Sequence, residues 1–206
     1  MAGDESTIEA LKADELRAAL AGCIIGREII VVRETASTND FVLQMAGPDV
    51  AEGVVVFAET QTAGRGQRGK RWESSDRKGL WFSILLRPKV RIEESARLTT
   101  WLAGSICTTI AQNLQLPAEV KAPNDVHVNG RKIAGVLVEM RSRGNSYFAI
   151  AGIGVNVNQS LPDFPPKLRE TAASLAMIAG HPIARGPFAA ALLRDFDATY
   201  RELLRV

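Results

Sequence analysis

Residues 64–72, which read GRGQRGKRW, place three glycines and four cationic side chains in one short segment. Guanidinium groups bind phosphate and carboxylate groups through paired hydrogen bonds, and glycines let the backbone approach a ligand closely. The segment therefore predicts a loop that orders around a small phosphorylated ligand. Two other interpretations stay open here, a solvated basic loop and a surface that contacts nucleic acid.

Two familiar phosphate-binding patterns match this segment in residue type and spacing but not in structural context. Gly64, Gly66 and Gly69 have the spacing of a dinucleotide fingerprint, and Gly64, Gly69 and Lys70 have that of a phosphate-binding loop. Both patterns need a helix directly after the loop. Turn-forming residues and an apolar run follow instead, and Arg71 stands where the phosphate-binding loop has Ser or Thr. The segment is expected to join two strands.

A second cluster, VKAPNDVHVNGRKIAGVLVEM at 120–140, contains a lysine just before a turn. Pro123 restricts the residue before it to an extended conformation, and Asn124 and Asp125 then lead the chain into a strand. Taken alone, Lys121 would be an ordinary surface charge, and the hairpin that follows would be plain scaffold.

The elements that position these clusters follow from hydrophobic periodicity and turn signals. We expect helices at 5–21, at 41–46 after the polar Ser/Thr cap at 37–40, at 93–115 and at about 187–204. We expect strands at 28–32, 53–60, 80–86, 125–128, 132–140 and 147–158. The Asn129-Gly130 pair favours a two-residue hairpin turn. This order lacks regular βαβα alternation, so it predicts a single α+β domain over 1–206, with an antiparallel or mixed sheet and helices on one side.

Composition and charge exclude several classes of protein and of site. The 206 residues carry a net charge of only +2, so anion binding must come from local clusters. Cys23 and Cys107 lie too far apart to suggest a disulfide framework or a zinc site. The acidic, polar N-terminus differs from a secretory signal, and no apolar run approaches the ~20 residues that span a bilayer. We expect a cytoplasmic protein with no membrane contact.

Five motifs occur in a fixed order along the chain: STN at 37–39, ETQTAGRGQRGKRW at 59–72, Lys121 with PND at 123–125, RKIAGVLVE at 131–139 and GIGVNVN at 152–158. In this combination they resemble the biotin protein ligases, which activate biotin with ATP and attach it to a carboxylase carrier protein. The resemblance covers about residues 28–158. It implies the fold shared with class II aminoacyl-tRNA synthetases, a mixed, largely antiparallel sheet flanked by helices.

The resemblance also implies a reaction and its participants. Biotin and ATP would form biotinyl-5′-AMP with magnesium present, and biotin would then pass to a lysine of a biotin carboxyl carrier protein. Nucleic acid is not expected as a partner. Members of the family often pair edge to edge through their sheets, which leaves a homodimer open.

Site residues carry over motif by motif. The resemblance implies catalytic roles for Lys121 and Arg65. Residues implied to contact biotin are Ser37, Thr38, Asn39, Gln61, Arg65, Gly66, Gln67 and Lys121. Those implied to contact the nucleotide are Arg68, Lys70, Trp72 and Asn124, and Asp125 would lie near the metal.

The reaction accounts for the residue types. A carboxylate that attacks the α-phosphorus of ATP meets another anion, so cations must lie between them and stabilise charge as pyrophosphate leaves. The substrate carboxylate is itself the nucleophile, so no Ser-His-Asp or Cys-His set is required. A glycine-rich loop that closes would protect the anhydride from water.

The chain departs from the family pattern at two positions and in its extent. Gln67 stands where the loop often has Arg, which should weaken the hold on the adenylate. Ala122 stands where Trp is usual, and a large-to-small change at a packed site costs roughly 3–5 kcal/mol. We also expect no N-terminal helix-turn-helix, hence no repressor activity, and no C-terminal β-barrel domain.

Three alternatives remain. The first is a lipoate–protein ligase, which would share the fold and the adenylate chemistry. The second is a catalytically impaired biotin binder, suggested by Ala122. The third is a nucleic-acid-binding module that uses the basic loop.

Overall fold

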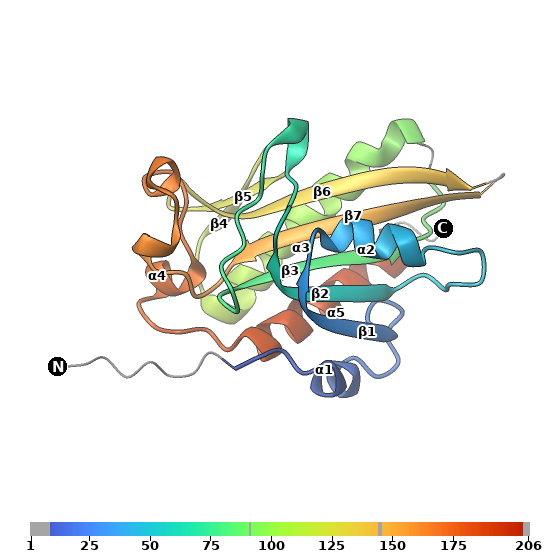
Figure 1. Cartoon of the computed structure of the whole chain (residues 1–206), viewed down its shortest axis with the longest axis horizontal. Helices are drawn as coiled ribbons and strands as arrows, with labels where there is room; N and C mark the ends of the chain where they lie inside the picture. Colours follow the sequence, from blue (N-terminus) through green and yellow to red (C-terminus); the bar gives the residue numbers. More distant parts are fainter. Residues whose placement is uncertain (1–8, 91, 144–145, 204–206) are drawn as a thin grey trace.

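The computed structural model of the chain describes residues 9–90, 92–143 and 146–203, which form one mixed sheet with helices on both faces (Figure 1). The described strands are β1 (Glu28–Thr35), β2 (Val54–Gln61), β3 (Gly79–Leu86), β4 (Ala118–Lys121), β5 (Asp125–Val128), β6 (Arg131–Arg143) and β7 (Ser146–Asn156). Their order across the sheet is β1-β2-β3-β7-β6-β5-β4. Among the described strands, β1 and β2 form the one parallel pair, so the predicted mixed, largely antiparallel sheet is confirmed.

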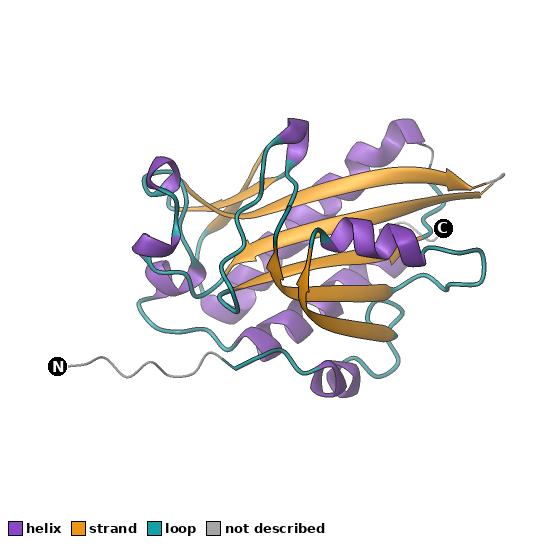
Figure 2. Ribbon diagram, in the orientation of Figure 1, coloured by secondary structure: helices purple, strands orange, loops and turns teal. Residues whose placement is uncertain are grey.

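The helices cover both faces of the sheet, as Figure 2 shows. Those described are α1 (Ala13–Ala19), α2 (Thr38–Met45), α3 (Ser95–Leu114), α4 (Leu175–Ala179) and α5 (Arg185–Leu203). Helices α1, α3 and α5 bury their apolar sides in the main core. Helix α2 packs on the opposite face, in a smaller core with Val54, Val56 and Ile150. The expectation that helices lie on one side was therefore wrong.

Strand composition explains why two cores form. Successive side chains of a strand point to opposite faces. In β2, Val55 and Phe57 enter the main core while Val54 and Val56 enter the smaller one. All eight residues of β3 are buried. A central strand covered on both faces needs such a continuous apolar run, because neither face meets water.

Several predicted boundaries shift. The helix predicted at 5–21 forms only over Ala13–Ala19 among the described residues, and residues 1–8 lie outside the described part. Strand β4 and helix α4 were not predicted. The hairpin turn is confirmed, since Asn129 and Gly130 have φ angles of 50° and 74°, as a type I′ turn requires. Among the described helices, none combines the length and the apolar character needed to cross a bilayer.

One side of the sheet gathers the candidate clusters. The first turn of α2 contacts β7, because a Cβ on Gly152 would lie 2.3 Å from Asn39 Oδ1. Gly135 of β6 and Gly154 of β7 are register partners. A side chain on either glycine would collide with Trp72, which shows that the loop after β2 folds back over the middle of the sheet. In Figure 1 this loop rises from β2 and returns to β3.

Candidate active site

A pocket of about 530 Å³ lies on this side of the sheet. Its volume falls within the range of small-molecule sites. Every site residue implied by the sequence lines it, although these residues come from three separate segments of the chain. The lining set includes Ser37, Thr38, Asn39, Gln61, Arg65, Gly66, Gln67, Arg68, Lys70, Trp72, Lys121, Asn124 and Asp125.

One end of the pocket consists of buried, mutually bonded polar groups. The Gln61 Oε1 atom accepts from the Thr38 backbone N–H at 2.9 Å and from the Thr38 hydroxyl at 3.2 Å. The Ser83 hydroxyl lies 2.7 Å from Thr38 Oγ1 and 2.5 Å from Asn39 Oδ1. Ser37 is the N-cap residue of α2, as expected, but its side chain makes no capping hydrogen bond. These contacts fix the orientation of the Gln61 and Asn39 amides before any ligand binds.

The glycine loop is a short hairpin with no α-helix after it, as the sequence predicted. Trp72 N–H donates to Gly64 O at 2.9 Å, and Gly66 N–H donates to Lys70 O at 2.6 Å. The tip is a 3₁₀ turn over Gln67–Gly69. Arg68 in this turn has a φ of 56°. The turn places the loop cations around the rim of the pocket.

Carboxylates of the chain itself neutralise part of this charge, which the sequence interpretation did not anticipate. Arg65 Nη1 donates to both oxygens of Asp40, at 2.5 and 2.6 Å, and Nη2 donates to Glu139 Oε2 at 2.9 Å. The hydrogen bonds with Asp40 are the largest cause of a raised Arg65 pKa. Burial raises the pKa of Glu139, but hydrogen bonds from Asn39 and Arg65 outweigh it and the net shift is downward.

Three other cations at the pocket lack such partners, whereas Arg71 pairs with Glu73 at 3.8 Å. Arg68, Lys70 and Lys121 are exposed and line the pocket. Among the described side chains, none of the three forms an ion pair. Three unmatched positive charges around one opening attract a polyanion strongly.

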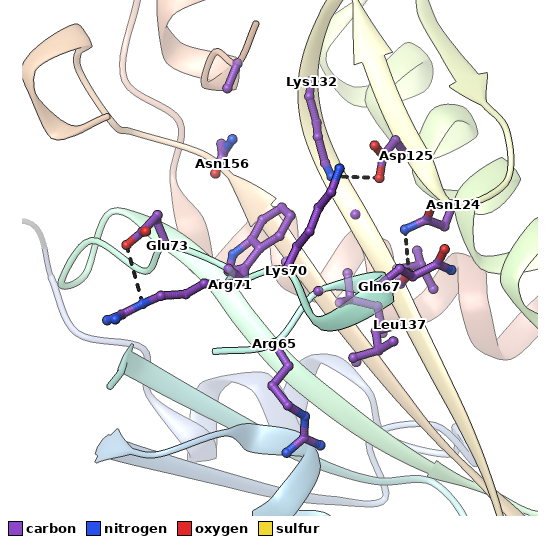
Figure 3. Close-up of a pocket in the computed structure, with 18 of the residues that line it drawn as sticks. Arg65, Gln67, Lys70, Arg71, Glu73, Asn124, Asp125, Lys132, Leu137 and Asn156 are labelled. Carbon is purple, nitrogen blue, oxygen red and sulfur yellow. Dashed lines mark hydrogen bonds and ion pairs between the residues drawn. The ribbon is translucent and has the colours of Figure 1, made fainter. Parts of the chain in front are cut away.

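The far wall holds a lysine that the sequence interpretation missed. Lys132 Nζ lies 2.7 Å from Asp125 Oδ1 and 5.2 Å from the centre of the Trp72 ring. Figure 3 shows Lys132, Asp125 and Asn124 at one end, while Arg65 points toward the other. The available signal was a lysine at the start of the apolar run RKIAGVLVE, but only the hairpin register shows that it faces the pocket.

The turn between β4 and β5 lies at the rim. Asn124 is fastened to β6, since its Nδ2 donates to Val136 O at 3.0 Å and its backbone carbonyl accepts from Val136 N–H at 3.0 Å. Ala122 is exposed. It lies at the opening of the pocket and not in a packed core, so the cost expected for a packed Trp-to-Ala change does not apply.

The donor set bears on metals and nucleophiles. In the described residues, no three His, Cys, Asp or Glu side chains gather into a metal site. Asp125 offers one carboxylate, which suits Mg²⁺ bound mainly through phosphate oxygens. Neither cysteine lines the pocket, and burial raises the pKa of Cys23 and of Cys107, which disfavours thiolate chemistry.

Comparisons with known proteins agree with this geometry. The family model described as "Biotin/lipoate A/B protein ligase family" matches residues 31–156. The Bifunctional ligase/repressor BirA of Bacillus subtilis (strain 168) is 33% identical over 195 residues, which are 94% of this chain and 60% of that protein. The Biotin--[acetyl-CoA-carboxylase] ligase of Mycobacterium tuberculosis is 35% identical over 193 residues, which are 89% of this chain and 68% of that protein. The chain thus spans roughly three-fifths to two-thirds of these relatives.

Solved structures give the same result. The biotin protein ligase from Aquifex aeolicus, in complex with biotin and ATP, superposes with a TM-score of 0.74 at 31% identity. The match covers 85% of this chain and 71% of that one. A putative lipoate protein ligase from T. acidophilum with bound lipoic acid has a TM-score of 0.64 at 14% identity and shares the fold alone. By the matched model and these relatives, the chain belongs to the biotin/lipoate A/B protein ligase family.

Proposed function

We propose that the chain is the catalytic domain of a biotin protein ligase, which forms biotinyl-5′-AMP from biotin and ATP and transfers biotin to a lysine of a biotin carboxyl carrier protein. The observation that carries this proposal is one pocket with two chemically different ends. Buried, oriented amides and hydroxyls form one end, and unmatched cations with Trp72 form the other. Such a pocket suits a neutral polar ring joined to a polyanion.

The buried end suits the ureido ring of biotin. Asn39 and Gln61 are fixed by hydrogen bonds within the protein, so they cost little ordering when a ligand binds. The Ser37 hydroxyl, which makes no capping bond, is available to the ligand. Gly66 and Gln67 of the loop line the same pocket and would cover the ring. This placement points the biotin carboxylate toward the cations.

Adenylation needs positive charge at the point where two anions meet. A carboxylate oxygen of biotin attacks the α-phosphorus, and the bond from that phosphorus to the bridging oxygen of pyrophosphate breaks. Lys132 is best placed among the pocket lysines to stabilise this charge, because it lies on the pocket wall beside Trp72. Lys121, Arg68 and Lys70 would contact the phosphates from the rim. A magnesium ion bound to phosphate oxygens would have Asp125 as its protein ligand and would neutralise charge on the leaving group.

Transfer completes the reaction. The uncharged amine of the carrier lysine attacks the carbonyl carbon of the anhydride, and AMP leaves. The loop limits hydrolysis by excluding water from the adenylate until the carrier arrives. Arg65 pairs with Asp40 and Glu139 and points toward the opposite end of the pocket from Lys132 (Figure 3), so it would serve loop placement rather than charge stabilisation at phosphorus. We expect the reaction in the cytoplasm, where ATP is available, and self-association through a sheet edge stays a prediction.

Exchange of labelled pyrophosphate into ATP tests the proposal, because it needs adenylation alone. Exchange should depend on biotin and not on lipoate. Exchange with lipoate alone would favour the lipoate–protein ligase alternative. Tight biotin binding without exchange would identify a catalytically impaired binder.

A further inference from the structure

Glu139 of β6 lies between helix α2 and the glycine loop, the two parts of the chain that form the proposed biotin end of the pocket. The sequence interpretation did not single it out. Its Oε2 atom accepts from Asn39 Nδ2 at 2.7 Å and from Arg65 Nη2 at 2.9 Å. Its Oε1 atom accepts from Arg141 Nη2 at 2.8 Å. The Glu139 side chain is 19% exposed, so water competes less for its hydrogen bonds than at a fully exposed carboxylate.

The first contact orients Asn39 at the buried end of the pocket. A carboxylate can only accept hydrogen bonds, so the amide nitrogen of Asn39 must face Glu139. Asn39 Oδ1 then faces the Ser83 hydroxyl, 2.5 Å away. Gly152 leaves just enough room for this arrangement, because a Cβ there would lie 2.3 Å from Asn39 Oδ1. Without the carboxylate, one of the two contacts that fix the Asn39 amide is lost.

The second contact orients the covering loop. Arg65 is bound between Asp40 of α2 and Glu139 of β6. Both carboxylates therefore hold the segment that leads into Gly66 and Gln67. Asp40 forms no hydrogen bond with the Asn39 side chain among the described residues, so the two acids differ in their contacts. Asp40 holds the loop alone, whereas Glu139 holds both the loop and Asn39.

We propose that Glu139 is a positioning residue that orients Asn39 and the Arg65 end of the loop together, and so sets the affinity for biotin. The inference rests on the proposed function. Because one carboxylate serves both parts, losing it should affect biotin binding more than losing Asp40 does. Binding of ATP should change little, since the cations and Trp72 at the other end do not contact Glu139.

Calorimetric biotin titration of purified variants tests this. Glu139→Gln should weaken biotin binding by about 10- to 100-fold, the scale for charge-assisted hydrogen bonds. Asp40→Asn should cause a smaller loss. Arg141→Ala, which removes only the third partner of Glu139, is the matched control and should bind as the unaltered chain does. The KM for ATP should stay within about 2-fold in all three.

A second mutation separates the effect of Glu139 on Asn39 from its effect on the glycine loop. In an Arg65→Ala background, Glu139→Gln should still weaken biotin binding, because Asn39 remains affected. No additional loss would overturn the part of the inference that concerns Asn39. Glu139→Asp keeps the negative charge but moves it away from Asn39 and Arg65, because the side chain is shorter. Its biotin affinity should therefore lie between those of Glu139→Gln and the unaltered chain. This variant also replaces Glu139→Gln if the latter melts well below the unaltered chain.

Amide exchange in the ligand-free chain tests the proposed effect of Glu139 on the loop. Amide exchange at residues 64–72 of the ligand-free chain should be faster in Glu139→Gln and in Asp40→Asn, but not in Arg141→Ala. Unchanged biotin affinity and exchange in a folded Glu139→Gln variant would overturn the inference while leaving the proposed function intact. If the unaltered chain bound no biotin, the proposed function would fail first, and this role in biotin binding would fail with it.

Discussion

The ammonium of Lys132 lies 5.2 Å from the centre of the Trp72 ring, and the same ammonium pairs with Asp125 at 2.7 Å. A cation near an aromatic face is attracted to the ring, and a carboxylate beside it holds the charge in place. This arrangement joins the end of the glycine loop to the β5–β6 hairpin. It also places a charged group at the end of the pocket where the nucleotide phosphates are proposed to lie.

Lys132→Ala should therefore lower biotin-dependent pyrophosphate exchange by about 10²-fold, the scale for losing one charge-stabilising group. Lys121→Ala should lower it less, since an exposed charge is screened by water. The KM for biotin should stay nearly constant in both. Equal rates for Lys132→Ala and the unaltered chain would remove Lys132 from the mechanism.

Gly154→Ala should displace Trp72, because the new Cβ would lie 2.4 Å from the Trp72 ring. Overpacking of this kind costs about 1–3 kcal/mol of unfolding free energy. The KM for ATP should rise and Trp fluorescence should shift, since the ring loses its place on the sheet. Gly104→Ala is the control, because a Cβ there meets no atom within 4 Å and alanine favours helix α3. If Gly104→Ala lowered the free energy of unfolding as much as Gly154→Ala does, this account would be contradicted.

Gln67→Arg should slow the escape of biotinyl-5′-AMP. A positive charge about 4 Å from a phosphate in water contributes about 1 kcal/mol, or roughly 5-fold in the dissociation rate. Rapid filtration of the preformed adenylate complex measures this rate. Gln67→Glu provides the opposite charge and should speed escape; equal rates for the two variants would show that the loop tip does not contact the adenylate.

Stability should fall at low pH through Glu139 and Asp163. Burial raises the pKa of each carboxyl, but hydrogen bonds, from Asn39 to Glu139 and from Lys78 to Asp163, leave both values below the ordinary 4.5 and 3.8. The unfolded chain therefore takes up these protons first as the pH falls. The stabilisation is complete above the ordinary values and is lost as the pH drops through the lowered ones.

Urea unfolding from about pH 6 to about pH 3 measures this loss. Glu139→Gln should flatten the pH dependence, because the titrating group is gone. Glu119→Gln, at an exposed position of β4, is the matched control. An identical pH dependence in Glu139→Gln and the unaltered chain would show that this carboxyl does not contribute.

Local patterns in the sequence were enough to predict much of the fold. The apolar runs predicted at 53–60 and 80–86, which form β2 and β3, depend on near neighbours in the chain, as do the Asn129-Gly130 turn and the loop between two strands. The position of α2 on the second face could not be predicted this way, because an apolar stripe does not reveal which face of a sheet it will cover. Strand β4 was missed because its four residues, AEVK, are mostly exposed and lack an apolar pattern.

The site shows the same division. Residues in recognisable motifs, such as Thr38 and Gln61, were predicted, and the structure brings them together. Glu139 and Lys132 were missed as site residues although both lie in the quoted RKIAGVLVE motif. Their roles depend on partners as much as 100 residues away, as in the Asn39–Glu139 bond. Such pairings follow from strand register and helix placement, which no short pattern contains.

The central claim is that cations from separate segments bring the biotin carboxylate onto the α-phosphorus of ATP and that the resulting adenylate biotinylates a carrier. Intact-mass analysis of a biotin carboxyl carrier domain, incubated with this chain, biotin, ATP and magnesium, tests it most directly. The account predicts the mass gain of one biotinyl group on a single lysine, absent without ATP and strongly slowed by Lys132→Ala. A carrier of unchanged mass, in the presence of folded chain and all substrates, would contradict it.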